Sequence, residues 1–98
     1  MLDVRETDEF SEWLAALRDK RGRAIVLVRI ARLANGNPGD VAPVGDGVSE
    51  LRINFGPGYR VYYVQRGTKC VLLLAGGDKS SQARDIARAK RLVEEYEE

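Results

Sequence analysis

Two arginines occupy consecutive stretches of the chain that are both predicted to be β-strands, Arg52 on the first and Arg60 on the second. On one hairpin their guanidinium groups would be diagonal cross-strand neighbours, roughly 7–8 Å apart. The planar fork of a guanidinium suits a phosphate, and two cations at this spacing repel each other unless an anion lies between them. The pair therefore predicts a phosphate site flanked by Tyr62, ion pairs with Glu50 or Asp85, or plain exposure on a solvated face, and the pattern leaves these alternatives open.

A further basic residue lies at the junction between the last predicted strand and the last predicted helix. Two glycines there are followed by Asp78 and Lys79. Backbone N–H groups at a helix start, together with the lysine, would suit a phosphate. Gln82 and Asp85 are three residues apart and share one face of the predicted helix. In the alternative interpretation Asp78 or Ser80 is only an N-cap and Lys79 is a solvated charge.

The spacing of apolar residues predicts the elements that must position these side chains. Runs rich in β-branched residues predict strands at residues 2–6, 48–55, 59–66 and 69–75. Apolar residues at helical spacing predict helices at residues 7–19, 23–34 and 80–96. Thr7 is the expected first N-cap, residues 20–22 a break, and the glycine- and proline-rich residues 35–47 a loop. The order β-α-α-β-β-β-α indicates an α+β fold, with an antiparallel sheet packed on an N-terminal helical hairpin and a C-terminal helix on its other face.

The alternation of side chains along the predicted hairpin separates an apolar face from a polar one. If residues 56–58 form a three-residue loop, Asn54 lies opposite Arg60 and Arg52 lies opposite Tyr62. These four side chains then share the polar face, which the C-terminal helix covers in part. The residues of the third strand predicted to share the apolar face are Cys70, Leu72 and Leu74.

The composition excludes several classes of function. The chain has 98 residues, 44% of them apolar and 32% charged, which fits a single domain over residues 1–98. With no histidine and one cysteine, Ser-His-Asp and Cys-His catalysis are excluded, and neither a metal site nor a cofactor is expected. No apolar run is long enough for a membrane span and the N-terminus lacks a signal peptide pattern, so we expect a cytoplasmic protein that does not bind membranes.

Basic residues are concentrated in the body of the chain. Residues 13–93 hold 15 bases and 6 acids, a local charge of +9, while acidic residues gather at both ends. A basic body is compatible with nucleic-acid binding. A solvated surface with two acidic ends explains the same distribution.

Three ordered blocks of the sequence resemble the RelE/ParE toxin superfamily and, within it, the HigB-like addiction module killer proteins. The blocks are GxGVSELRI (residues 45–53), GPGYRVY (residues 56–62) and LLxGGDKxxQxxDI (residues 73–86). The resemblance implies a compact α+β fold of the microbial-RNase-like type. It also implies a toxin of a bacterial toxin–antitoxin pair, whose partner is a small antitoxin, often a helix-turn-helix DNA-binding protein.

Relatives of this type cut mRNA without a metal, usually on the ribosome, and the resemblance assigns roles by position. Arg60 falls at a catalytic arginine, Arg52 at a basic position of the preceding strand, and Lys79 at the basic position after the last strand. The tyrosine that some relatives carry on the final helix is absent, and Asp85 stands near its place. The predicted substrate-binding residues are Asn54, Tyr62, Gln82 and Asp85.

Two other functions fit the same resemblance. A ParE-like protein inhibits DNA gyrase without cutting nucleic acid. The polar strand face and Lys79 favour the ribonuclease over this alternative. A decayed toxin, kept only to bind its antitoxin, would do neither.

Overall fold

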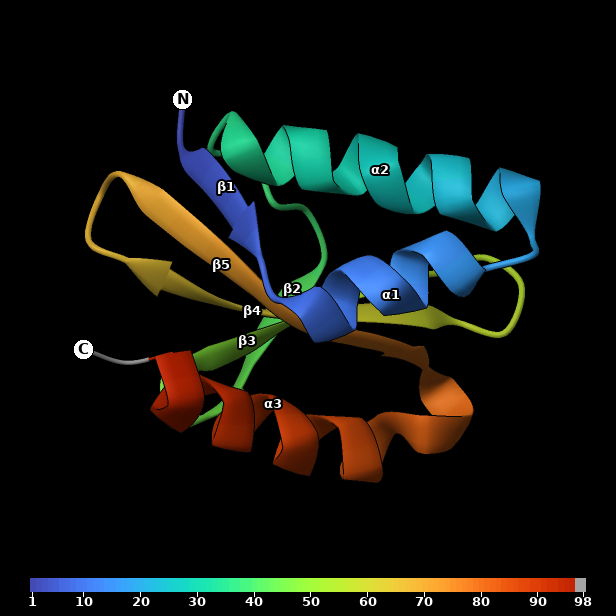
Figure 1. The fold of residues 1–98 in the computed structure, drawn as a ribbon. Coiled ribbons are helices and arrows are strands. Elements are labelled where there is room, and N and C mark those ends of the chain that lie inside the picture. Colours follow the sequence, from blue (N-terminus) through green and yellow to red (C-terminus); the bar gives the residue numbers. More distant parts are fainter. Residues whose placement is uncertain (97–98) are drawn as a thin grey trace.

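The computed structural model describes residues 1–96 and places them in a mixed α+β fold with a five-stranded sheet and three α-helices (Figure 1). The strands are β1 (Asp3–Glu6), β2 (Val41–Gly45), β3 (Val48–Ile53), β4 (Tyr59–Arg66) and β5 (Cys70–Asp78). The helices are α1 (Asp8–Ala16), α2 (Lys20–Ala34) and α3 (Gln82–Tyr96), with the short 3₁₀-helix η1 (Lys79–Ser81) before α3. The predicted α+β class is confirmed.

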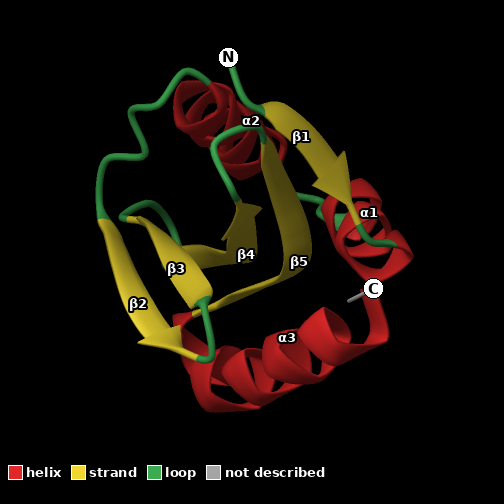
Figure 2. Ribbon diagram, turned by 90° about the vertical axis from the view of Figure 1, so that its left-hand side faces the viewer, coloured by secondary structure: helices red, strands yellow, loops and turns green. Residues whose placement is uncertain are grey.

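The sheet lies between two helical layers. Its strand order is β1-β5-β4-β3-β2, antiparallel as expected except that β1 runs parallel to β5. α1 and α2 cover one face and α3 covers the other (Figure 2). The first layer buries Phe10, Val26 and Leu33, whereas α3 buries Ala89 and Leu92. Within residues 1–96, no helix has the length and apolar character that crossing a membrane requires.

Residues 41–45 form strand β2, where the sequence predicts only a loop. β2 pairs with β3 at the edge of the sheet, and a bulge separates Pro43 from Gly45. Proline and glycine weaken the strand pattern, but both are tolerated at an edge because one side of an edge strand has no neighbour to pair with. The observed order therefore contains one strand more than the predicted one.

The first two helices form the predicted hairpin, but α2 begins earlier than expected. Thr7 is the N-cap of α1, as predicted, and its Oγ1 accepts a hydrogen bond from a first-turn N–H at 3.0 Å. The predicted break at residues 20–22 is instead the first turn of α2, capped by Asp19. Gly22 lies in this turn because Tyr59 packs against it, and a Cβ there would lie 2.5 Å from Tyr59 Cε2. The glycine thus marks a close contact and not a helix end.

The β3–β4 hairpin is shifted by two residues from the predicted pairing. Arg52 lies directly opposite Arg60 and Ile53 opposite Tyr59, so Asn54 belongs to the turn. An even shift leaves each side chain on its predicted face. The two arginines are therefore direct neighbours, not diagonal ones.

Strand β5 turns its side chains the opposite way from the prediction. Leu73 packs with Tyr63 in the core beneath α1 and α2, whereas Leu72 and Leu74 pack with α3. A bulge between Tyr62 and Tyr63 leaves Leu74 as an extra residue, so simple alternation fails along this strand. A strand that is covered on both faces is apolar on both, and its orientation cannot be inferred from alternation.

Candidate functional site

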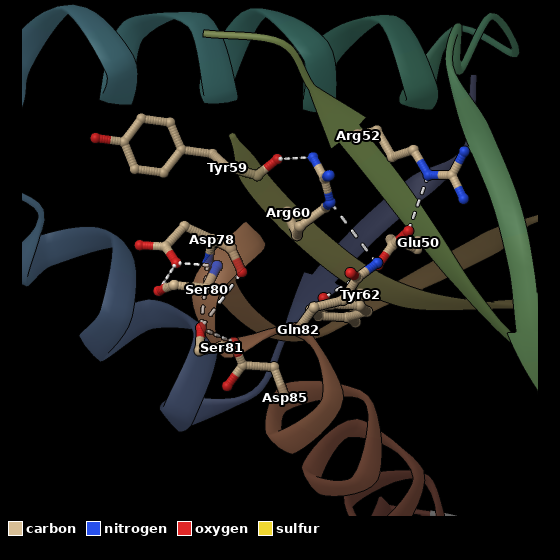
Figure 3. Close-up of polar contacts among 10 residues, drawn as sticks. All are labelled: Glu50, Arg52, Tyr59, Arg60, Tyr62, Asp78, Ser80, Ser81, Gln82 and Asp85. Carbon is tan, nitrogen blue, oxygen red and sulfur yellow. Dashed lines mark hydrogen bonds and ion pairs between the residues drawn. The ribbon is translucent and has the colours of Figure 1, made fainter. Parts of the chain in front are cut away.

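A cluster of polar side chains lies on the α3 face of the sheet, where β3 and β4 pass the beginning of α3 (Figure 3). Its centre is Glu50 of β3, whose side chain is fully buried. In the hairpin, Glu50 lies opposite Tyr62, and Arg52 lies opposite Arg60. Because alternate residues of a strand share a face, all of these side chains point to the same side. The register of the hairpin alone brings them together.

The Glu50 carboxylate holds the cluster together. Its Oε1 accepts a hydrogen bond from Arg52 Nε at 2.9 Å. Its Oε2 accepts one from Gln82 Nε2 at 2.6 Å and one from the Tyr62 hydroxyl at 3.2 Å. Arg60 Nε lies 3.9 Å from the same Oε2. One buried carboxylate therefore connects β3 and β4 to the first residue of α3.

The surroundings of Glu50 determine its protonation state. Burial raises the pKa of the Glu50 carboxyl, but hydrogen bonds from Arg52, Gln82 and Tyr62 and the charge of Arg60 together hold it below its ordinary value. Burial and the nearby Glu50 charge raise the pKa of the Tyr62 hydroxyl. At neutral pH the cluster thus contains a carboxylate, two guanidinium groups and a neutral phenol that donates a hydrogen bond.

Arg60 is buried yet leaves hydrogen-bonding capacity unused. Its side chain is 10% exposed, against 40% for Arg52. Its Nη1 donates to the Tyr59 carbonyl at 3.4 Å. Among residues 1–96 its Nε has no hydrogen-bond partner, because 3.9 Å to Glu50 is too long for one. A buried donor without a partner is costly, and the other such side-chain atom in the described part of the chain is Arg29 Nε.

Lys79 lies at the edge of the cluster, where η1 begins, and is exposed. Gly58 in the β3–β4 turn is close to both Lys79 and Arg60. A Cβ at Gly58 would lie 3.4 Å from Lys79 Cβ and 3.7 Å from Arg60 Nη1. The Lys79 N–H also donates to the Pro57 carbonyl at 3.4 Å. The lysine stem therefore starts at the same end of the hairpin as the Arg60 guanidinium.

The two glycines at the end of β5 belong to the strand and do not form the phosphate loop that their position predicts. Gly77 pairs with Arg60 in the sheet. A Cβ at Gly77 would overlap the Asp85 carboxylate, and one at Gly76 would overlap the Trp13 ring. Glycine is required at these positions because a side chain packs against each face of the strand.

Asp78 caps the turn that follows β5. Its Oδ1 accepts a hydrogen bond from Ser80 N at 2.9 Å, and it forms a capping box with Ser81. Ser81 Oγ in turn donates to the Asp85 carboxylate at 2.5 Å. The N-cap alternative for Asp78 is therefore the one that the structure adopts. Its carboxylate accepts a hydrogen bond at the helix start, where the sequence had suggested that a phosphate could bind.

Most of the predicted site residues come together around Glu50. Those in direct contact with its carboxylate are Arg52, Tyr62 and Gln82, with Arg60 in an ion pair. Lys79 lies at the edge of the cluster, and Asp85 lies one helical turn beyond Gln82, against the end of β5. Substrate binding by these residues stays a prediction.

Two residues are misjudged from sequence, both because of the hairpin register. Asn54 is exposed beyond the end of β3, away from its predicted place opposite Arg60. Glu50 is the centre of the cluster, whereas the sequence suggests it only as one possible ion-pair partner. Glu50 lies two residues before Arg52, so the sequence already indicated that the two side chains share a face. Its position opposite Tyr62 could be known only from the register of the hairpin.

The chain is similar to a known family and to a curated relative. Residues 8–94 match the family described as "Phage derived protein Gp49-like (DUF891)". An uncharacterized protein of Haemophilus influenzae is 46% identical over 94 residues, which cover 96% of this chain and 95% of the relative. Both similarities span β3, β4 and the start of α3, where the polar cluster lies.

Proposed function

We propose, on the premise that this chain belongs to the Gp49-like family, that it is a toxin which cleaves mRNA without a metal ion. The family belongs to the RelE/HigB-like toxin superfamily, and its members are commonly toxins of toxin–antitoxin systems. Membership implies an antitoxin as partner. The polar cluster supports an RNA phosphate as the substrate group, and the resemblance to RelE-like toxins is the reason to expect cleavage on the ribosome.

The observation that carries the proposal is the buried Arg60 guanidinium, whose Nε has no hydrogen-bond partner in residues 1–96. Arg52 lies directly opposite and is more exposed, and Lys79 adds a third cation at the edge. A phosphate between these groups would accept from the unused donors and relieve the repulsion between like charges. Glu50 meanwhile holds both arginines in place.

In the proposed reaction the 2′-oxygen of the RNA attacks the adjacent phosphorus. The bond from phosphorus to the 2′-oxygen forms, the bond to the 5′-oxygen breaks, and the products are a 2′,3′-cyclic phosphate and a 5′-hydroxyl. Arg60 and Arg52 stabilise the negative charge that develops on the non-bridging oxygens. The 2′-hydroxyl proton passes to water, the Lys79 ammonium protonates the leaving 5′-oxygen, and Gln82 and Asp85 orient the substrate.

Positioning supplies much of the expected rate enhancement. The chain has no histidine, the side chain that ordinarily titrates near neutral pH. Correct orientation of the reacting groups alone contributes up to roughly 7–11 kcal/mol. A ribosome that holds mRNA in a fixed, bent path supplies this orientation. We therefore expect cleavage of mRNA on the ribosome and little cleavage of RNA in solution.

Arg60→Ala tests the site most directly. We expect the cleavage rate to fall by about 100- to 1,000-fold, as when one preorganised donor to a developing oxyanion is lost. Arg60→Lys keeps the charge but not the planar fork and should recover part of the rate. Arg91→Ala, at an exposed arginine of α3, is the matched control. Toe-printing in a translation extract measures cleavage, and growth arrest reports toxicity in cells.

Thermal unfolding of each variant separates a loss of activity from a loss of fold. A folded Arg60→Ala protein that still cuts mRNA and arrests growth contradicts the proposed site. If the unmodified chain leaves mRNA intact but inhibits DNA supercoiling, it is a ParE-like gyrase inhibitor. If it does neither, it is a decayed toxin.

A further inference from the structure

Helix α2 has an apolar stripe on its exposed side. The stripe consists of the exposed residues Ala24, Leu27, Val28 and Ala31. Their spacing of i, i+3, i+4 and i+7 places them on one helical face. Leu27 is 48% exposed and Val28 is 58% exposed. In the described part of the chain, the other large apolar side chains this exposed are Met1 and Tyr96 at its two ends, so the α2 stripe is an unusual surface feature.

The α2 stripe is separate from the core of the fold. The inner side of α2 packs Val26, Ile30 and Leu33 into the core beneath the helical layer. α2 lies at the outside of the molecule, on the far side of the sheet from α3 (Figure 1). One apolar face is enough to attach a helix to a sheet. A second apolar face that remains exposed indicates a binding partner.

The charges around the stripe all have one sign. α2 contains five basic residues and no acidic residue in its sequence KRGRAIVLVRIARLA. A helix completes one turn in about 3.6 residues. Arg32 therefore lies one turn after Val28, Arg23 lies one turn before Leu27, and Arg21 lies one turn before Ala24. Cations border the stripe along both of its sides.

The N-terminal turn of α2 carries charges of the unfavourable sign. Lys20 and Arg21 occupy this turn, which contains no acid, whereas the first turn of α1 contains Asp8 and Glu9. The helix dipole places partial positive charge at an N-terminus, so two cations there lower the stability of the isolated chain. The Asp19 carboxylate at the N-cap supplies some negative charge to this turn, and acidic residues of a bound partner would add to it.

We propose that the α2 stripe is the docking surface for an acidic amphipathic helix of the antitoxin. The proposal rests on the toxin–antitoxin assignment, while the location and chemistry of the surface come from α2. The partner helix presents apolar residues to Leu27 and Val28, and Asp or Glu residues to the arginines on either side. RNA suits the surface less well, because the centre of the stripe is aliphatic and offers no aromatic ring for base stacking.

A second copy of this chain is a poorer occupant of the stripe. Two α2 helices packed face to face would bring together five bases from each with no acid between them. The acidic end of α3 cannot substitute, because the apolar residues Ala89 and Leu92 of α3 are already buried against the sheet. Charge complementarity therefore argues against paired α2 helices and for an acidic partner helix, while pairing of α2 with the acidic N-terminal residues of a second copy is an outcome that the test below detects.

The experiment measures binding of this chain to the small protein encoded by the adjacent open reading frame. Leu27→Asp combined with Val28→Asp removes the apolar centre and adds two negative charges. We expect the Kd to rise by at least about 100-fold, as for a central interface anchor replaced by a repulsive group. Ala83→Asp combined with Ala87→Asp makes the same charge change at exposed positions of α3 and is the matched control, with a Kd within about twofold of the unmodified chain.

A second variant tests the role of the flanking charges. Arg21→Glu combined with Arg32→Glu should slow association by about tenfold and weaken its dependence on salt, because rim charges act mainly on the encounter rate. Unchanged association kinetics would show that the partner is not acidic where it meets α2 and would overturn that part of the proposal.

Growth arrest by the chain alone is measured in parallel, so that docking and toxicity are judged separately. We expect the Leu27→Asp, Val28→Asp chain to arrest growth and to escape neutralisation by the neighbouring protein. Equal binding by the unmodified chain and this variant overturns the docking surface and leaves the toxin proposal standing. Conversely, an unmodified chain that causes no growth arrest contradicts the toxin proposal, while the binding data still decide the surface.

Three further outcomes overturn the proposal, and the last two of them assign the stripe to another occupant. The first is that the neighbouring protein does not bind the unmodified chain. In the second, the Leu27→Asp, Val28→Asp variant binds the neighbouring protein normally but loses binding to ribosomes, which indicates an RNA contact. The third is loss of self-association in the same variant, seen by analytical ultracentrifugation, which indicates a second copy.

Discussion

Glu50 and Leu51 are neighbours in β3, and both side chains are fully buried, but on opposite faces of the sheet. Leu51 lies opposite Val61 in an apolar core covered by α1 and α2. Glu50 lies under the start of α3, with the buried Arg60 side chain beside it. An apolar side chain gains free energy when it leaves water. A charged one loses hydration and must find partners in the fold.

The contrast separates a face that is stabilised by burial of apolar side chains from one that buries ionised groups. Apolar residues of similar volume often stabilise a protein as well as a buried ion pair does, or better. The α3 face nevertheless keeps two arginines, and the Arg60 Nε lacks a hydrogen-bond partner within residues 1–96. The proposed binding of an RNA phosphate would give these groups a role beyond stability.

Glu50→Ala is expected to have the largest effect on stability. It should lower the free energy of unfolding by about 3–5 kcal/mol, because it leaves the buried Arg60 guanidinium without its counter-charge. Combining it with Arg60→Ala should restore part of this loss, since no unpaired charge then remains. Denaturant unfolding of the two single variants and the double variant measures the coupling between the residues.

On the apolar face, Leu51 and Val61 form the pair of opposite residues with which Glu50 and Arg60 are compared. Leu51→Ala should cost about 2–5 kcal/mol, and adding Val61→Ala directly opposite should increase that loss. If the Glu50→Ala, Arg60→Ala double variant also lost more stability than Glu50→Ala alone, the two faces would respond alike. The claim that an unpaired charge causes the loss on the α3 face would then be wrong.

Gly76 and Gly77 of β5 allow the two faces of the sheet to be compared at neighbouring residues, because each glycine packs against a different face. Replacing either by Ala should cost about 1–3 kcal/mol, since a Cβ would overlap Trp13 on one face or Asp85 on the other. Gly77→Ala should also reduce mRNA cleavage, because it displaces the Asp85 carboxylate that is proposed to orient the substrate. Gly76→Ala should leave cleavage by the folded protein unchanged. Equal cleavage by the two variants, measured by toe-printing and corrected for the folded fraction, would exclude Asp85 from the site.

The smallest expected effect is the pH dependence that Glu50 contributes on the α3 face. Because the pKa of Glu50 is lowered in the folded state, its ionisation contributes stability above the unfolded pKa of about 4.3. This contribution is lost as the pH falls through the folded pKa. Unfolding of the unmodified chain and of Glu50→Gln should therefore differ most near neutral pH and converge in acid.

Asp19, near the opposite face of the sheet, contributes to the pH dependence of both the unmodified chain and Glu50→Gln. Its contribution therefore cancels in the difference between their free energies of unfolding. Hydrogen bonds from Gly22 and Tyr59 lower the pKa of Asp19, and its contribution is the same with Glu or Gln at position 50. A stability difference that stays constant from neutral to acid pH would show that Glu50 is not held ionised by its neighbours.

Much of the fold followed from local patterns in the sequence. The N-cap at Thr7 and the limits of β4 at residues 59–66 are as predicted, because caps and strand ends depend on residues close in sequence. The resemblance led to the superfamily that the Gp49-like match supports. Arg52 and Arg60 were placed on one face of one hairpin by alternation alone.

Features that depend on the pairing of distant segments could not be predicted in this way. Two registers of the hairpin differ by two residues and keep the same faces, so the pattern could not choose between Arg52 and Asn54 as the residue opposite Arg60. Gly76 and Gly77 resembled a phosphate loop, and only packing showed that Trp13 and Asp85 exclude any larger residue.

The sequence by itself determined the composition of the site and of α2, because residue types and their spacing are written in the chain. Only the tertiary structure decided that Glu50 is the centre of the site and that Leu27 and Val28 are exposed. The physical reason is that burial and hydrogen bonding depend on which elements pack together. Periodicity shows that a helix has apolar residues on two sides, but not which side the sheet covers.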